Sequence, residues 1–268
     1  MSSFPSYLKP GLSSAHATNP LPVILCLHGG GTNATIFNIQ AMRLQRLLND
    51  SFQFVFLDGP SVTSAGAGVM PYFEGCDPFF RWFRAGKDVN VMPPETRQQV
   101  LRALEYLDEE REAGEMGEVV GFLGFSQGAK LGAGLLWEQM VQTSESKWNF
   151  KFGVMCNGIA PPMCEVREED KSLRITTPTL HVVGQEDTWR ESSRKLYDQY
   201  FDKSTSNKFE FPIGHRLPTA DDETKKIADE ILRIWQSCGE KPAEKVVEKT
   251  TGKKSNLAAV VSVGEVVV

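Results

Sequence analysis

The chain has 268 residues, of which 41% are hydrophobic and 24% charged, as is usual for a globular protein with a sizeable core. Its formal net charge of −5 argues against nucleic acid as a partner, because phosphate binding needs a concentrated basic surface. There is no run of about 18 apolar residues, so we expect no membrane span, and residues 1–22 do not resemble a secretory signal.

The five cysteines also restrict the class of protein. Their number is odd and their spacing matches no zinc-binding pattern, so we expect neither a disulfide framework nor a metal site. Cys26 and Cys156 lie within apolar runs, which indicates buried free thiols. A reducing, cytoplasmic compartment fits this usage best.

Short apolar runs alternate with helical patterns after an N-terminal arm at residues 1–20. The runs predict strands buried on both faces, with a weaker sixth at the end, over residues 23–27, 54–57, 119–125, 150–155, 179–183 and 209–211. Apolar residues at helical spacing lie between or after them, at Leu44, Leu47, Leu48, Val100, Leu101, Leu104, Leu107, Ile227, Ile231, Ile234 and Trp235. This alternation predicts one three-layer α/β domain over residues 21–236, with a mostly parallel sheet and helices on both faces.

Two segments depart from this alternation. Residues 58–95 are too long for a tight connection, and they either pack their aromatic side chains on the core or form a lid or acyl-pocket wall. The aromatic residues concerned are Tyr72, Phe73, Phe79, Phe80, Trp82 and Phe83. Residues 237–268 mix Lys, Glu and Val without a helical face, so we expect a disordered tail.

The pentapeptide from Gly124 to Gly128 has the pattern Gly-x-Ser-x-Gly and is centred on Ser126. It follows the apolar run at 119–125 and precedes a helical stretch at 127–140, which is the strand–turn–helix context of a nucleophile elbow. Glycines are needed on both sides because the sharp turn leaves no space for side chains there. We therefore expect Ser126 to be a catalytic nucleophile.

A serine hydroxyl is a weak nucleophile unless a base removes its proton, and histidine usually serves as that base. Of the four histidines, His16 lies in the N-terminal arm, whereas His28 and His181 belong to strand-like runs. His215 follows the last strand and precedes the last helix, where an α/β-hydrolase places its base. Elimination and chain order both favour His215.

The imidazole needs an acid that fixes its tautomer and stabilises the imidazolium. Glu186 and Asp187 follow the run at 179–183 and lie between Ser126 and His215 in sequence. We favour Asp187, with Glu186 as the rival, and either could instead cap the helix that begins near Trp189.

An oxyanion hole needs backbone N–H groups aimed at the charge that develops in the tetrahedral intermediate. One donor should be the amide of Gln127, the residue after the nucleophile. The other should come from the glycine-rich turn after the first strand, with Gly30 favoured and Gly31 the alternative. This turn lacks the residues that would make it a phosphate-binding loop or a dinucleotide fingerprint.

Five sequence blocks together resemble a known group of serine hydrolases. It is typified by the yeast family of serine hydrolases, by the human ovarian-tumour-associated hydrolase and by fungal esterases of polyketide gene clusters such as the lovastatin one. These blocks cover residues 27–29, 56–60, 124–128, 178–182 and 214–215. The resemblance implies an α/β-hydrolase fold, a triad of Ser126, Asp187 and His215, and hydrolysis of a small-molecule acyl ester or thioester without a cofactor. It also implies, as a partner, the acyl carrier domain of a polyketide synthase.

The chain departs from the family pattern at Gly30-Gly31-Thr32, at Arg216 and at Trp189, which leaves the shape of the substrate open. A basic cluster at Arg81, Arg84 and Lys87 could dock an acidic carrier domain, or could simply be solvated charge. The alternatives to a carrier-dependent thioesterase are a general carboxylesterase and a non-catalytic binding protein with the same fold.

Overall fold

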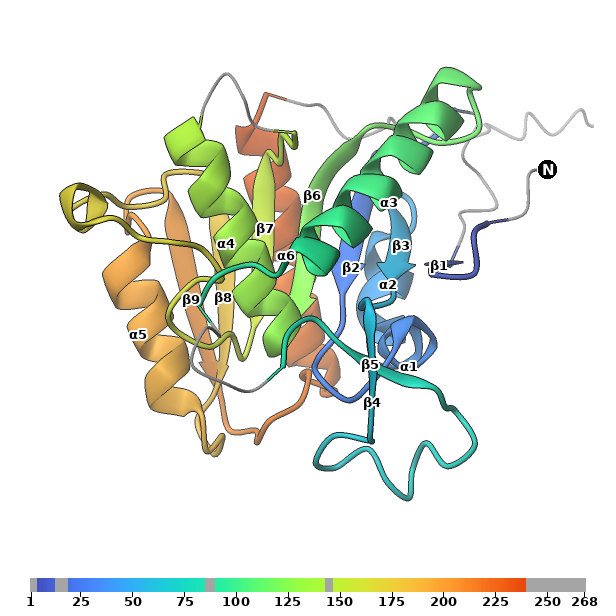
Figure 1. The fold of residues 1–268 in the computed structure, drawn as a ribbon, viewed down its shortest axis with the longest axis horizontal. Coiled ribbons are helices and arrows are strands. Elements are labelled where there is room, and N and C mark those ends of the chain that lie inside the picture. Colours follow the sequence, from blue (N-terminus) through green and yellow to red (C-terminus); the bar gives the residue numbers. More distant parts are fainter. Residues whose placement is uncertain (1–3, 13–18, 85–89, 143–146, 240–268) are drawn as a thin grey trace, which may run out of the picture.

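The computed structural model describes residues 4–12, 19–84, 90–142, 147–239. Its main sheet has seven strands in the order β1-β3-β2-β6-β7-β8-β9, and all neighbours are parallel except β1 and β3 (Figure 1). The strands are β1 (Leu8–Pro10), β2 (Val23–Leu27), β3 (Gln53–Leu57), β6 (Val119–Phe125), β7 (Phe152–Cys156), β8 (Thr179–Gly184) and β9 (Ser206–Phe211). The expected α/β-hydrolase sheet is therefore confirmed, including the weak sixth strand.

Helices cover both faces of this sheet (Figure 1). One face packs against α3 (Pro94–Glu112), α4 (Gln127–Gln142) and α5 (Arg190–Tyr200). The other packs against α1 (Ala34–Gln40), α2 (Met42–Leu48) and α6 (Asp221–Ser237). A short 3-10 helix, η1 (Glu168–Asp170), lies in the connection between β7 and β8. The two buried clusters are apolar, so the central strands are buried on both faces as their composition predicts.

The N-terminal arm contains a strand that is not among those predicted from the sequence. Residues Leu8–Pro10 form β1 and pair antiparallel with β3, and the side chain of Leu8 is fully buried. Three residues are too few for a periodic pattern, so the sequence carried no strand signal here.

Two other local expectations also differ. The strand predicted from residue 150 begins at Phe152, because the side chain of Gln139 on α4 bonds both the N–H and the carbonyl of Phe150. On α2, Leu44 and Leu48 are buried as expected, whereas Leu47 is largely exposed and Gln45 takes the buried position.

The long connection at 58–95 contains a small hairpin of β4 (Ser61–Thr63) and β5 (Phe79–Arg81). A bridge between Thr32 and Phe80 attaches this hairpin to the turn after β2. None of the described helices is long and apolar enough to cross a membrane. The expected tail at 237–268 lies almost entirely outside the described residues.

Candidate active site

Ser126 lies at the sharp turn between β6 and α4. Its φ of 52° is in the left-handed region that L residues rarely adopt, and its N–H donates to the carbonyl of Cys156. A Cβ at Gly128 would lie 1.9 Å from the carbonyl oxygen of Leu27, and one at Gly124 would lie 2.7 Å from the backbone of Ala129. Both glycines are thus required by close backbone approach, and the strained turn presents the Ser126 hydroxyl above the sheet edge.

His215 lies in the loop between β9 and α6, 89 residues after Ser126. Its Nε2 is 2.9 Å from Oγ of Ser126, and its Nδ1 is 2.7 Å from Oδ2 of Asp187. The side chain of His215 is 32% exposed, so one edge of the ring faces solvent. An imidazole that carries its proton on Nδ1 can donate to Asp187 and accept from Ser126 in this geometry.

The structure separates the two neighbouring acids after β8. The carboxylate of Asp187 is completely buried and its Oδ1 accepts a hydrogen bond of 2.8 Å from the N–H of Trp189. Glu186 is exposed, and its N–H donates to the carbonyl of Ile213. Only Asp187 of this pair is bonded to His215, and neither acid is the N-cap of α5, a position that Trp189 occupies.

The glycine-rich turn lies beside the nucleophile, since a Cβ at Gly29 would be 3.6 Å from Cβ of Ser126. The N–H of Gly31 donates to the carbonyl of Phe80 at 2.8 Å and is therefore already used. Among the described residues, neither the N–H of Gly30 nor that of Gln127 has an acceptor. The pair expected to form an oxyanion hole is thus the pair with free donors, and Gly30 is favoured over Gly31.

The side chain of Gln127 lies close against this turn. Its Oε1 accepts a hydrogen bond of 3.2 Å from the N–H of Trp82, and a Cβ at Gly30 would meet its amide at 2.5 Å. The same nucleophile-elbow residue therefore connects α4, the glycine-rich turn and the segment after β5.

His28 and His181 are both buried, and among the described residues the histidine bonded to the hydroxyl of Ser126 is His215. Burial lowers the pKa of His28 to about 4, and its Nε2 accepts from the N–H of Gly59. Burial, reinforced by the charge of Lys208, lowers the pKa of His181 to about 3. Both imidazoles are neutral packing elements, as their strand positions predict. His16 lies outside the described residues.

The six aromatic residues of the long connection differ in their surroundings. Tyr72 is 84% exposed, whereas Trp82 is fully buried with its Nε1 donating to the carbonyl of His28. Trp82 therefore stabilises the start of the glycine-rich turn through this hydrogen bond. Because its side chain is fully buried, it does not form part of an exposed pocket wall. The other four are half-buried, namely Phe73, Phe79, Phe80 and Phe83.

Two buried polar residues near the site were not anticipated from the sequence. Asn157 follows β7 with a φ of 47° and bonds the segments that carry Asp187 and His215. Lys130 lies one turn after Ser126, and its Nζ donates to Asn90 and lies over the ring of Phe83. Burial lowers the pKa of Lys130 to about 8. A polar residue directly after an apolar strand was the available signal for Asn157.

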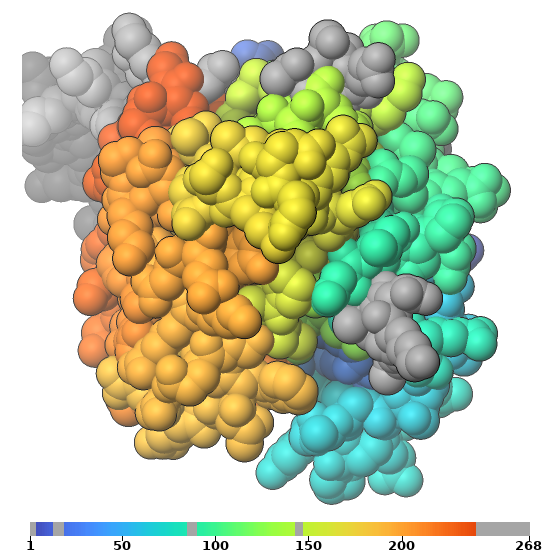
Figure 2. All heavy atoms as spheres, turned by 60° about the vertical axis from the view of Figure 1, so that its left-hand side comes forward, coloured from blue at the N-terminus to red at the C-terminus, as the bar shows by residue number. Residues whose placement is uncertain are grey.

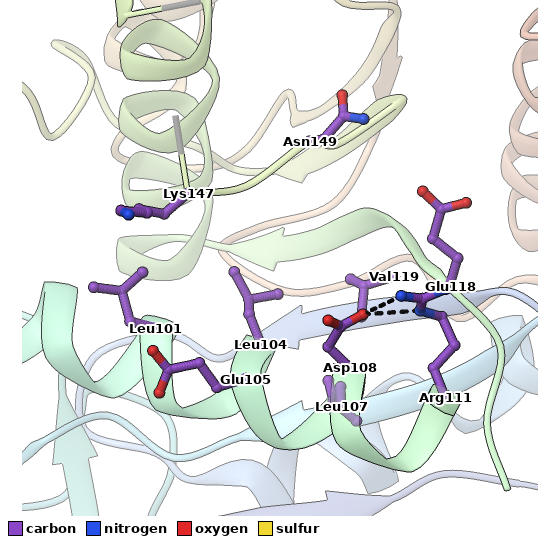
Figure 3. A pocket seen from close by; sticks show the side chains of 10 residues that line it. All are labelled: Leu101, Leu104, Glu105, Leu107, Asp108, Arg111, Glu118, Val119, Lys147 and Asn149. Carbon is purple, nitrogen blue, oxygen red and sulfur yellow. Dashed lines mark hydrogen bonds and ion pairs between the residues drawn. The ribbon is translucent and has the colours of Figure 1, made fainter. Parts of the chain in front are cut away.

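Figure 2 shows a hollow in the surface between the long connection, in cyan, and the region of α5, in orange. Chain in blue, the colour of β2 and the turn after it, is visible at its bottom. A separate cavity of about 310 Å³ lies between α3 and the residues before β7 (Figure 3). It borders Val119 at the start of β6, the opposite end of the strand from Ser126, and its wall includes the ion pair of Arg111 with Asp108. This cavity is therefore not part of the candidate active site.

Residues 19–227 match the family described as serine hydrolase (FSH1). The chain is 33% identical over 237 residues to a protein of Gibberella fujikuroi named esterase FUS5, covering 88% of this chain and 97% of that protein. It is 28% identical to a protein of Gibberella zeae named thioesterase FSL2, covering 83% and 96% of the two chains. Acyl-protein thioesterase 2 of Zea mays shares the fold, with a TM-score of 0.53, 17% identity and coverage of 85% and 98%.

Proposed function

The chain belongs to the FSH1 serine hydrolase family and is a hydrolase, and we propose that it cleaves a carboxylic ester or thioester through an acyl-enzyme on Ser126. The observation that carries this proposal is the continuous hydrogen-bonded chain from Oγ of Ser126 through the His215 ring to Asp187. Residues so far apart in sequence meet in this order because each follows the carboxyl end of a parallel strand.

In the first half-reaction, Oγ of Ser126 bonds to the substrate carbonyl carbon while its proton passes to Nε2 of His215. The carbonyl oxygen becomes an oxyanion that the N–H groups of Gln127 and Gly30 stabilise, each worth about 3 kcal/mol. The imidazolium is stabilised by Asp187 and returns its proton to the departing oxygen or sulfur as the bond to it breaks.

In the second half-reaction, water takes the place of the leaving group. His215 removes a proton from the water as its oxygen attacks the acyl carbon, and the same proton then passes to Oγ of Ser126. The products are the free carboxylic acid and the regenerated hydroxyl. Neither half-reaction changes an oxidation state, and water is the only co-reactant that hydrolysis needs.

The direct test is Ser126→Ala beside Ser204→Ala, a serine that bonds only within its own surface turn. We expect Ser126→Ala to lose hydrolysis of short p-nitrophenyl esters and covalent labelling by a fluorophosphonate, while Ser204→Ala retains both. Wild-type rates in Ser126→Ala would overturn the proposal.

A carrier-bound thioester is the finer substrate class that we propose. One relative is named a thioesterase, and Arg84 is exposed two residues beyond Trp82, whose N–H bonds the residue after Ser126. Arg81 of the same basic cluster is half-buried, and Lys87 lies outside the described residues. A basic rim would attract an acidic acyl carrier domain of a polyketide synthase.

This docking idea can be separated from catalysis. Arg84→Glu should raise KM for a carrier-bound thioester and leave KM for a free small ester unchanged. Arg102→Glu, an equally exposed charge reversal on α3, is the matched control and should change neither. Equal effects of Arg84→Glu on both substrates would exclude carrier docking at this rim.

We further propose that the half-buried aromatic residues of the long connection form the wall that receives the acyl chain. Phe80 lies directly against the glycine-rich turn through the bridge to Thr32, and Phe83 follows Trp82. Phe83→Ala should therefore shift the preferred acyl length on a panel of p-nitrophenyl esters. Tyr72→Ala, at an exposed position, should leave the preference unchanged.

We also propose a reducing compartment such as the cytoplasm. Cys26, Cys156 and Cys164 are free cysteines that are buried as thiols, and Cys76 is a half-buried free cysteine. Microscopy of the full chain fused to a fluorescent protein tests this location, and a purely extracellular signal would contradict it.

A further inference from the structure

Asn157 occupies the position directly after β7, between the strand that leads to Ser126 and the strand that leads to Asp187. Its side chain is completely buried. Its φ of 47° makes it, with Ser126, one of two described non-glycine residues in the left-handed region. Such a conformation costs free energy and persists only where the surrounding contacts determine it.

The contacts of Asn157 reach both partners of the proposed nucleophile. Its Oδ1 accepts a hydrogen bond of 2.8 Å from the N–H of Gly184, which precedes Asp187 by three residues. Its Nδ2 donates to the carbonyl of Arg216 at 3.0 Å, with a longer contact of 3.5 Å to the carbonyl of Gly214. These two carbonyls stand on either side of His215 in the chain.

The backbone around Asn157 completes this connection. Its own N–H donates to the carbonyl of Val182 on β8, and the carbonyl of the preceding residue, Cys156, accepts from the N–H of Ser126. The chain at 156–157 therefore bonds three segments: the turn at Ser126, the acid turn at residues 184–187 and the histidine loop at residues 214–216. Among the described residues, the only other side chain that bonds both the segment after β8 and the histidine loop is that of Asp187 itself, through Trp189 and His215.

The acid turn and the histidine loop are also close at Gly184. A Cβ there would lie 2.5 Å from the carbonyl oxygen of Ile213 and 2.7 Å from that of Gly214. Since the two backbones are already in contact, a small rotation of the loop at 214–216 changes how His215 Nδ1 faces Asp187. The amide of Asn157 limits that rotation because it is bonded on both sides.

We propose that Asn157 is a positioning residue that sets the alignment of His215 between Asp187 and Ser126. The inference rests on the proposed function, because it assigns Asn157 an effect only through the hydrogen bonds of His215. An amide is required at this position, since one end must accept from an N–H and the other must donate to carbonyls. A carboxylate has the same shape, but its second oxygen would face the carbonyl of Arg216 without a proton to share.

Two variants test this requirement. Asn157→Gly removes both side-chain bonds and tolerates the positive φ, so it separates the loss of the amide from backbone strain. Asn157→Asp keeps the shape and the bond from Gly184 while replacing the donor to Arg216. Each should lower kcat by about 10- to 100-fold with little change in KM, because misplacement of a catalytic group by about 1 Å has effects of this size.

The matched control is Gln45→Ala on α2. Gln45 is as buried as Asn157, and its amide also bonds at both ends, to the N–H of Leu12 and to Asn38. A spectroscopic readout distinguishes positioning from general destabilisation, since the Nδ1 proton shared by His215 and Asp187 should give a far-downfield proton resonance. This resonance should weaken or shift in both Asn157 variants and persist in Gln45→Ala.

The outcomes separate this inference from the function beneath it. If Ser126→Ala is inactive and both Asn157 variants retain wild-type kcat and the downfield resonance, the positioning role is overturned and the hydrolase proposal stands. If Ser126→Ala is active, the proposed mechanism fails first. Should Asn157→Gly not fold, Asn157→Asp decides alone, and wild-type kcat in that variant would overturn the requirement for an amide.

Discussion

The N–H of Gly31 donates a hydrogen bond of 2.8 Å to the carbonyl of Phe80, which joins the glycine-rich turn after β2 to strand β5. The N–H of Phe80 returns a bond of 2.7 Å to the carbonyl of Thr32. The hairpin of the long connection thus fixes one side of the turn, and the N–H of Gly30 is left pointing to no acceptor among the described residues. A segment distant in sequence thereby engages the N–H of Gly31 and leaves that of Gly30 for the oxyanion hole proposed above.

The first prediction concerns Gly66, which contacts this turn from the long connection. Its N–H donates to the carbonyl of Gly31, and a Cβ there would lie 2.6 Å from the carbonyl oxygen of Gly30. Gly66→Ala should displace the proposed oxyanion donor and lower kcat about 10- to 100-fold, part of the effect of deleting such a donor. Steady-state kinetics on a p-nitrophenyl ester measure this, and the exposed change Ala67→Ser should be neutral. An unchanged kcat in Gly66→Ala would mean that Gly30 is not the donor.

The second prediction separates the two acids after β8. Asp187→Asn should lower kcat by about 10³- to 10⁴-fold, because an amide favours the wrong tautomer of His215 and cannot stabilise its cation. Glu186→Gln should have little effect, since Glu186 is exposed and the carboxylate bonded to His215 is that of Asp187. Parallel measurements of kcat on the two variants decide, and the reverse ranking would assign the acid to Glu186.

The third prediction concerns stability at acid pH. The pKa of His181 is about 3 in the folded protein, because it is buried, against an ordinary value of 6.5. Between these values the unfolded chain binds a proton that the folded chain does not, so the free energy of unfolding decreases as pH falls, by about 1.4 kcal/mol per pH unit. His28 acts in the same direction between 6.5 and about 4.

His181→Leu should therefore make the protein less sensitive to acid. The replacement removes a titrating group and also a buried Nε2 that has no hydrogen-bond partner among the described residues. Urea denaturation at pH 7 and pH 5 gives the measurement, and the loss of stability between them should be smaller in the variant. Equal losses in wild type and variant would show that His181 does not titrate in this way.

The fourth prediction concerns the ion pair that joins α3 to the nucleophile helix α4. Arg97 bonds both oxygens of Glu138 at 2.8 and 2.5 Å, and the side chain of Glu138 is only 10% exposed. Arg97→Met keeps the apolar stem but leaves a buried carboxylate unpaired, so it should destabilise the fold by about 1–3 kcal/mol, allowing for the partial exposure of Arg97.

The double change Arg97→Met with Glu138→Leu should recover most of that loss, because no uncompensated charge remains. Denaturant unfolding measures both variants, with Arg102→Met at an exposed position of the same helix as control. If the double variant were as unstable as the single one, packing rather than the unpaired charge would be responsible.

The pattern that a nucleophile elbow requires could be read from the sequence, because its residues lie together between Gly124 and Gly128. The elbow around Ser126 needs glycines two residues away on each side, and a Cβ added at either glycine would lie only 1.9 to 2.7 Å from backbone atoms. The parallel strands follow from short apolar runs, and their order places Asp187 and His215 after later strands.

Other features depend on contacts between residues that are distant in the chain, and no periodicity or motif encodes those. The preference for Asp187 over Glu186 depends on which of the two side chains is buried and bonded to His215. The proposal of Gly30 rather than Gly31 depends on the hydrogen bond that the N–H of Gly31 donates to the carbonyl of Phe80. Strand β1 forms because three residues pair with the edge of β3. In the sequence, Asn157 is only a polar residue that follows an apolar strand. In the fold, packing brings Gly184 to one end of its amide and Arg216 to the other.

The sequence by itself therefore determined the fold class and singled out the candidate nucleophile and the order of its proposed partners, because glycine spacing and hydrophobic runs act over a few residues. The tertiary structure decided which of the two adjacent acids is bonded to His215 and which backbone segments the amide of Asn157 joins. The physical reason is that a hydrogen bond is specified by the distance and direction between two groups, and for groups far apart in the chain only packing sets these.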